Sequence, residues 1–353
     1  MTRPHAGRIA PAGAVTPVAF SPFLWPSGWR ALPVLSACVA LACLATATTV
    51  RADTFPSRAV RLISPFPAGS GPDAVSRLLG ERLGKEWGQP VIVDSRPGGN
   101  GFIAMEAGKR APATGHELVV ADVGHLAINP GLFKRLPYDP RRDFVPVTGL
   151  YRTAFFIVVS QQSQIRTVPD LIAAARKAPD AVTYGSWAVG SSGHLGAAQL
   201  EAATGTQMLH APYKDTAQLY TAVANGEVTW ALGTYATAGP LIQAGKLRVL
   251  AVADSVRSPV LPNVPTLAEA GGPAGVEASS WVALLAPAAT PPATVTAIGR
   301  AVRTALGDPE VKAKLATFGF TPAGSTSEDV AGWMAHDSQR YTELIRRTGA
   351  TVN

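Results

Sequence analysis

The stretch 59-AVRLISPFPAGSGPDAVSRLLGERLGKEW-87 contains an apolar run, a loop rich in Gly and Pro, and an amphipathic pattern, in that order. The apolar run at 59–66 is typical of a buried strand. From 73 to 87 the apolar residues recur at helical spacing and share one face, namely Val75, Leu78, Leu79, Leu83 and Trp87. The stretch therefore predicts a strand, a short loop and a helix, which is the repeating unit of α/β proteins.

The same alternation continues along the chain. Further strands are predicted at 90–96, 116–122, 181–186, 207–212, 228–234 and 247–253. Further helices are predicted at 101–111, 168–178, 193–204, 216–226, 238–245, 292–307, 309–319 and 327–349. Residues 258–278 are rich in Pro and Gly and predict a loop with one short helix. This order of elements predicts an α/β fold with mostly parallel sheets.

Two long apolar segments, 144–160 and 279–287, interrupt the alternation. The first is too long for an ordinary strand, so it is either two strands or one segment that crosses between domains. Together they predict two α/β lobes joined by two crossing strands, 53–152 with 282–353, and 153–281. Ligands of open α/β sheets bind beyond the carboxyl ends of the strands, so we expect a cleft between the lobes. The loops expected at this cleft are 65–73, 122–130, 186–194, 212–216 and 233–239.

The first 52 residues differ from the rest of the chain. They contain four arginines, no lysine and no acidic residue, and residues 31–50 form an apolar run that ends shortly before Ala52. This pattern predicts a secretory signal peptide over 1–52, cut near Ala52, and an exported, periplasmic protein. A transmembrane anchor is one alternative. A lipoprotein processing site at Cys38 is another, although the apolar segment before Cys38 is short.

Composition excludes several classes of function. Both cysteines, Cys38 and Cys43, lie in the predicted leader, so the rest of the chain has no thiol for a disulfide, a nucleophile or a metal. Four of the 31 Lys and Arg residues and none of the 24 acidic residues lie there, which leaves a net charge of +3. The basic residues are scattered, which argues against nucleic acid as a partner. The histidines lack metal-ligand spacing, so neither a metal nor a cofactor is expected.

The loop PFPAGSGPD at 65–73 joins the first predicted strand to the first predicted helix. Gly69 and Gly71 allow backbone N–H groups to approach a ligand, and Asp73 is the expected N-cap. N–H groups at the N-terminus of a helix attract anions. A phosphate loop is not expected, because Gly-Lys-Ser/Thr and a full G-x-G-x-x-G are both absent. A ligand-binding loop and an ordinary turn both remain open.

The segment GSSGH at 190–194 repeats this arrangement before another predicted helix. Ser191 and Ser192 offer hydroxyl groups and the helix start offers free N–H groups, which favours an anion cradle. A plain N-cap at Ser192 is the alternative. A serine hydrolase using Ser192 and His194 is a weaker alternative, because the G-x-S-x-G elbow is absent and the sequence locates no orienting acid.

Eight segments, in this order along the chain, resemble the Bug family of extracytoplasmic solute receptors, also called TctC-like. The segments are RLISPFPAGSGPD, VIVDSRPGGNG, AINPGLFKRLPYDPRRDFVPVT, GSSGHL, HAPYKD, AGKLRVLAV, RSPVLPNVPTLAEAG and WVALLAPAATP. The resemblance implies a type II periplasmic binding-protein fold with a Venus-flytrap cleft and no catalysis. It implies a small carboxylate ligand and, as partners, the membrane permease subunits of a tripartite tricarboxylate transporter. An orphan receptor that presents its ligand to a signalling protein is the alternative, and we expect a monomer.

The resemblance also assigns the loops at 66–73 and 190–194 as the two halves of a carboxylate site. With the residues that end neighbouring strands, the expected ligand-binding set is Phe66, Pro67, Ala68, Gly69, Ser70, Gly71, Asp73, Asp122, Trp187, Gly190, Ser191, Ser192, Gly193, His194, Tyr213, Gly233 and Thr234. The chain departs from the family pattern at Asp122 and Trp187, where small or hydroxyl residues are usual. Because Asp122 would repel a second carboxylate, we expect a ligand other than a citrate-like tricarboxylate, such as a monocarboxylate with an amine or ring nitrogen.

Overall fold

A computed structural model describes residues 55–214 and 216–350. The predicted signal peptide at 1–52 and its alternative anchor lie outside these residues. Within the described part of the chain, none of the helices combines the length and the apolar character needed to cross a membrane.

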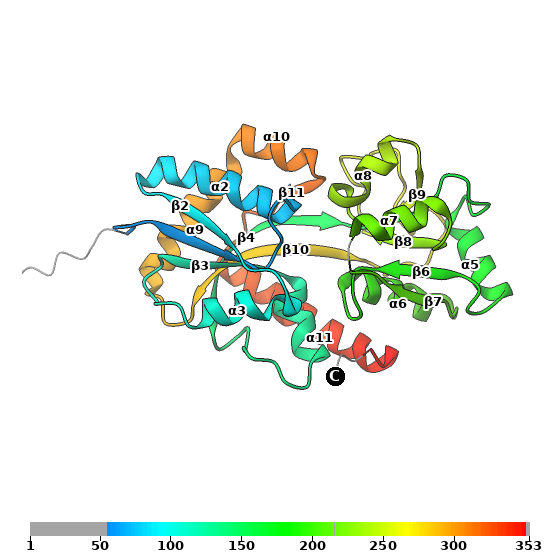
Figure 1. Cartoon of the computed structure of the whole chain (residues 1–353), viewed down its shortest axis with the longest axis horizontal. Coiled ribbons are helices and arrows are strands. Elements are labelled where there is room, and N and C mark those ends of the chain that lie inside the picture. Colours follow the sequence, from blue (N-terminus) through cyan, green and yellow to red (C-terminus); the bar gives the residue numbers. More distant parts are fainter. Residues whose placement is uncertain (1–54, 215, 351–353) are drawn as a thin grey trace, which may run out of the picture. The chain divides into compact units, whose positions relative to one another are not determined.

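A six-stranded sheet has the strand order β11-β4-β10-β3-β1-β2. Its strands are β1 (Val60–Ser64), β2 (Val91–Ser95), β3 (Glu117–Asp122), β4 (Phe144–Ala154), β10 (Ser279–Pro287) and β11 (Phe320–Pro322). One face packs against α2 (Gly71–Trp87), α9 (Pro292–Gly307) and α10 (Pro309–Thr317). The other packs against α3 (Phe102–Lys109), α4 (Asn129–Leu132) and α11 (Ser327–Thr348). Figure 1 shows α2 and α10 on the opposite side of this sheet from α3 and α11.

A five-stranded sheet has the order β7-β6-β8-β5-β9. Its strands are β5 (Phe156–Ser160), β6 (Thr183–Ser186), β7 (Leu209–Pro212), β8 (Trp230–Gly233) and β9 (Leu247–Val252). Its helices are α5 (Val168–Lys177), α6 (Ser192–Thr204), α7 (Thr216–Asn225) and α8 (Tyr235–Gln243). We propose that the two sheets are the cores of the two predicted lobes; lobe 1 contains the six-stranded sheet and lobe 2 the five-stranded sheet.

The chain passes between the sheets beside Phe155, the single residue that separates β4 from β5. The Phe155 N–H donates to the carbonyl of Ala278 (3.1 Å), and its own carbonyl accepts from Ala253 N–H (2.7 Å). The Ala278 N–H donates to the Ala253 carbonyl (2.7 Å), so each of the three residues is hydrogen-bonded to the other two. Of the two interpretations of 144–160, the structure therefore contains two strands with the crossing between them.

Three expectations about the fold were wrong. The sheets are mixed rather than mostly parallel: β1 runs parallel to β2 and β3, whereas β10 runs antiparallel to β3 and β4, because it enters the sheet from the crossing. Of residues 258–278, none is helical, and the loop is held by turns and a bridge between Val252 and Thr266. The stretch after β3, expected as a loop, forms a π-helical turn at Gly124–Ile128 that continues into α4.

Candidate functional site

The segment from the end of β6 through the first three residues of α6, residues 187–194, is called the lobe-2 loop below. Gly190 has a φ of 76°, a left-handed conformation that favours glycine. Its N–H donates to Nδ1 of His194 at 2.9 Å. Ser191 caps α6, because its Oγ accepts from the His194 N–H at 3.3 Å. The helix cap is therefore Ser191, one residue before Ser192, which the sequence offered as the alternative cap.

Ser192 and Gly193 follow as the first two residues of α6. Within 55–214 and 216–350, the structure contains no acceptor for either N–H group, nor a hydrogen-bond partner for the Ser192 hydroxyl. The positive end of the helix dipole strengthens the attraction of these three donors for an anion. The first turn of α6 can therefore hold an anion such as a carboxylate.

Trp187 lies directly against this turn. A Cβ atom on Gly193 would stand 2.5 Å from Cζ3 of the indole, so only glycine fits between the helix and the ring. The same indole is half-buried and packs on Phe155 at the crossing, with ring centroids 5.5 Å apart. Trp187 is therefore part of the lobe-2 core and also borders the donor groups of α6.

His194 belongs to a buried stack of rings rather than to a catalytic pair. Its imidazole stacks on His210 with centroids 4.0 Å apart, and His210 stacks on Tyr184 at 4.9 Å. Ser186 Oγ lies 2.7 Å from His210 Nε2. Burial lowers the pKa of His194, and burial together with His194 lowers the pKa of His210 to about 4. Both rings are therefore neutral at pH 7.

In lobe 1 the segment after β1 that ends with the first three residues of α2, residues 66–73, is called the lobe-1 loop below. The predicted N-cap Asp73 was wrong, because Ser70 caps α2 and Asp73 is the third helical residue. Asp73 accepts from Gly69 N–H (2.8 Å), Arg77 Nε (2.9 Å) and Ser95 Oγ (3.0 Å), and only 2% of it is exposed. Burial opposes its ionisation, but these hydrogen bonds and the Arg77 charge lower its pKa below the ordinary value.

Asp122, at the end of β3, is paired with His125. Its Oδ1 lies 2.6 Å from His125 Nδ1 and accepts the His125 backbone N–H at 3.2 Å. Burial raises the pKa of Asp122, but the charge and hydrogen bonds of His125 outweigh it and the net shift is downward. The imidazole meets the half-buried Phe66 edge to face, with centroids 5.6 Å apart. Asp122 is therefore an ionised carboxylate that is partnered within the chain.

Two contacts connect lobe 1 to lobe 2 near these loops. A Cβ atom on Gly71, the first residue of α2, would stand 3.6 Å from Cβ of Ala236 in the first turn of α8. A Cβ atom on Gly190 would overlap the side chain of Leu132 in α4. The first turns of α2 and α8 therefore adjoin each other, and the lobe-2 loop adjoins α4.

The other predicted residues differ in their surroundings. Pro67 and Ala68 are exposed. Tyr213 is half-buried in the lobe-2 core, where Gly233 lies under the ring of Tyr220. Thr234 precedes α8, and its hydroxyl lies 3.0 Å from that of Thr237.

The structure singles out Tyr151 in β4, which the sequence analysis did not consider. It is 1% exposed, and its Oη has no hydrogen-bond partner among the described residues. In the sequence it lies within the long apolar segment 144–160, where its hydroxyl is the only feature that could have drawn attention to it.

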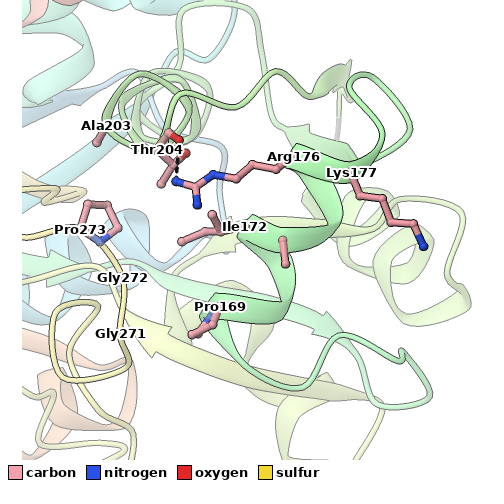
Figure 2. Close-up of a pocket in the computed structure, with 10 residues that line it drawn as sticks. Pro169, Ile172, Arg176, Lys177, Ala203, Thr204, Gly271, Gly272 and Pro273 are labelled. Atoms are coloured by element: carbon pink, nitrogen blue, oxygen red, sulfur yellow. Dashed lines mark hydrogen bonds between the residues drawn. The ribbon is translucent and has the colours of Figure 1, made fainter.

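A separate hollow of about 700 Å³ lies on lobe 2, between α5, the end of α6 and residues 271–273 (Figure 2). Arg176 reaches across it to the Thr204 carbonyl at 3.0 Å. None of the predicted ligand-binding residues lines it. The described residues also contain no group of three or more side chains suited to a metal ion.

The profile of the family described as "Tripartite tricarboxylate transporter family receptor", or TctC, matches residues 75–350. The chain belongs to the TctC family. TctC proteins are transporter receptors rather than enzymes, which disfavours the hydrolase interpretation. The resemblance noted in the sequence is thereby confirmed.

Two TctC relatives match nearly end to end. Protein BugT of Bordetella pertussis is 32% identical over 92% of this chain and 98% of its own length. A protein from the tcbD-tcbE intergenic region of Pseudomonas sp. is 33% identical over 87% of this chain and 91% of its own.

Solved TctC-like structures confirm the periplasmic binding-protein fold. An R. palustris protein solved with adipate has a TM-score of 0.77 and 33% identity, covering 84% of this chain and all of its own. MatC from Rhodopseudomonas palustris, solved with bound malate, has a TM-score of 0.73 and 26% identity, covering 82% of this chain and all of its own. This TctC protein is therefore a solute receptor of the periplasmic binding-protein class.

Proposed function

We propose that this receptor captures a small carboxylate between its two lobes and delivers it to the membrane permease of a tripartite tricarboxylate transporter. The observation that carries the proposal is the first turn of α6, where two N–H groups and the Ser192 hydroxyl have no partner among the described residues. Hydrogen bonds from such donors to a carboxylate are charge-assisted and therefore strong. The adipate and malate bound by two relatives support a dicarboxylate as the ligand.

We further propose that the protein works in the periplasm as a monomer after removal of residues 1–52. Binding should bring the lobes together, because a ligand that touches both favours the closed arrangement by its differential affinity. Closure requires rotation about the crossing at Phe155, Ala253 and Ala278, where three backbone hydrogen bonds join the passing segments.

A matched pair of neighbouring serines tests the carboxylate site. Ser192→Ala removes a donor that has no other partner, so affinity for adipate or malate should fall about tenfold with unchanged stability. Ser191→Ala removes the helix cap, so it should lower the free energy of unfolding by about 1 kcal/mol and affect affinity less. Calorimetry and thermal unfolding measure the two effects. Failure of the wild-type protein to bind any small carboxylate would refute the proposal, as would equal affinities of wild type and Ser192→Ala.

A further inference from the structure

Three residues lie opposite one another across neighbouring strands of the six-stranded sheet. Val282 of β10 pairs with Tyr151 of β4 on one side and with Asp122 of β3 on the other. Side chains of directly paired residues point to the same face of a sheet. Tyr151 and Val282 belong to the core packed against α2. Asp122 therefore projects on this face as well, and its Cα lies two strand spacings, about 10 Å, from that of Tyr151.

Tyr151 is linked to the start of α2 through Phe320. Its ring stacks on Phe320, with centroids 4.2 Å apart and an interplanar angle of 11°. The Phe320 ring in turn would stand 3.0 Å from a Cβ atom on Gly71, the first residue of α2. The phenol is therefore placed between the first turn of α2 and Asp122, at the end of the sheet that faces the predicted cleft.

The hydroxyl of Tyr151 is a donor without an acceptor. It is 1% exposed, and no described residue accepts its proton. Burial and the charge of Asp122 raise the pKa of Tyr151 well above its ordinary value, so the group stays protonated. Buried polar groups in folded proteins nearly always have a partner, and an unsatisfied one is costly. The phenol therefore requires an acceptor from outside the described chain.

Asp122 supplies the complementary group. The Asp122 carboxylate accepts from His125 and from the Gly124 backbone, and with 26% of its side chain exposed it keeps a lone pair for a further donor. The pair thus presents one hydrogen-bond donor and one anionic acceptor.

A ligand group at this place must accept from the Tyr151 hydroxyl and donate to the Asp122 carboxylate, and few chemical groups do both. A second carboxylate accepts from Tyr151 but is repelled by Asp122. An ammonium donates to Asp122 but leaves the phenol proton without an acceptor. A hydroxyl group donates to Asp122 and accepts from Tyr151, so it satisfies both. We propose that Tyr151 and Asp122 form a subsite that recognises a hydroxyl group on the bound carboxylate.

This inference rests on the proposed carboxylate receptor and replaces the amine-bearing ligand that Asp122 alone suggested. Matched acids that differ by one hydroxyl test it: malate against succinate, 2-hydroxyglutarate against glutarate, and 2-hydroxyadipate against adipate. The wild-type protein should bind one hydroxy acid at least about tenfold more tightly than its deoxy partner, because the deoxy acid leaves Tyr151 unpaired.

Tyr151→Phe should abolish this preference while the melting temperature stays the same or rises, because the variant keeps the ring and removes an unpaired buried hydroxyl. Tyr341→Phe is the matched control, a buried tyrosine in the core on the other face of the sheet whose hydroxyl already accepts from Arg340 Nη2 (3.5 Å), and it should keep the preference. Asp122→Asn should also reduce the preference, because a neutral amide accepts more weakly than a carboxylate.

The outcomes separate the two proposals. If the wild-type protein binds at least one acid but shows no hydroxyl preference, or if Tyr151→Phe retains it, the subsite is wrong and the carboxylate receptor stands. If the wild-type protein binds none of the six acids, both proposals are overturned.

Discussion

The lobe-1 and lobe-2 loops are built on the same backbone plan. Asp73 in α2 and His194 in α6 each occupy the third helical position after a serine cap. Each accepts the N–H of the glycine four residues earlier, Gly69 at 2.8 Å and Gly190 at 2.9 Å. Both glycines have positive φ, 81° and 76°. The two loops thus share one hydrogen-bonding pattern, in which a side chain from the first turn of the helix accepts a backbone N–H of the residues before it.

The two side chains differ in charge, and this difference separates the roles of the loops. Asp73 places its own negative charge at the positive end of α2 and is paired with Arg77. Pro72 also removes one of the first N–H groups of that helix. Neutral His194 places no negative charge at the start of α6, so the unpaired donors of its first turn remain available to an anionic ligand. We infer that the lobe-2 loop is the stronger anion site, whereas the lobe-1 loop mainly shapes the cleft.

The largest expected difference between the loops comes from their glycines. Gly190→Ala forces a side chain into a left-handed conformation and against Leu132, so it should lower the free energy of unfolding by about 3 kcal/mol or more. Gly69→Ala has nothing within 4 Å of the new atom and should cost about 1 kcal/mol. Urea unfolding measures both, and Leu132→Ala should recover part of the Gly190→Ala loss. Equal losses at the two glycines would contradict this comparison.

The second difference is in the response to pH. The folded-state pKa values of His194 and His210 are lowered, so the unfolded chain binds more protons below pH 6.5. Stability is therefore complete above about pH 6.5 and falls as the pH drops towards the His210 pKa of about 4. The pKa of Asp73 lies below its ordinary 3.8, so the lobe-1 loop should lose its contribution only in stronger acid.

Between pH 7 and pH 5 we expect His210 to account for a loss of about 1–2 kcal/mol in the free energy of unfolding, because solvent partly screens its half-buried ring. Carboxylate affinity should fall where His194 itself takes up a proton, below its ordinary pKa, because a protonated His194 Nδ1 cannot accept the Gly190 N–H. Unfolding and calorimetry at several pH values measure both quantities. His210→Gln should flatten the stability profile, whereas His336→Gln, on a 76% exposed side chain, should not. If the stability profile of His210→Gln matched that of the wild-type protein, the stacked histidines would not be the cause of the loss of stability at low pH.

The smallest expected effect comes from the charge of the lobe-1 loop. Asp73→Asn keeps an oxygen for the Gly69 N–H and loses the pairing with Arg77, whose side chain is 54% exposed. Stability should fall by about 1 kcal/mol. Carboxylate affinity should rise by less than about threefold, because one negative charge leaves the end of α2. A large loss of affinity in calorimetry would instead show that Asp73 contacts the ligand.

Local pattern predicted most of the elements, including the strand and helix at 59–87, because apolar spacing reports which side of an element is buried. It failed at β11, whose three residues are too few to show a period, and in the Pro-rich loop at 258–278. The cap positions were also displaced. The N-caps are Ser70 rather than Asp73 and Ser191 rather than Ser192, since capping depends on backbone angles that adjacent polar residues do not reveal.

The sequence by itself determined the family, the α/β class and the two glycine- and serine-rich loops before helices, because these depend on residue types at short spacing. Only the tertiary structure decided which donors stay unpaired, that His194 is neutral within a stack, and that Asp122 is paired with His125. It alone placed Tyr151 on the same sheet face as Asp122, across an intervening strand. Hydrogen bonding, burial and charge at these positions are set by side chains far apart in the chain, and no local pattern contains that information.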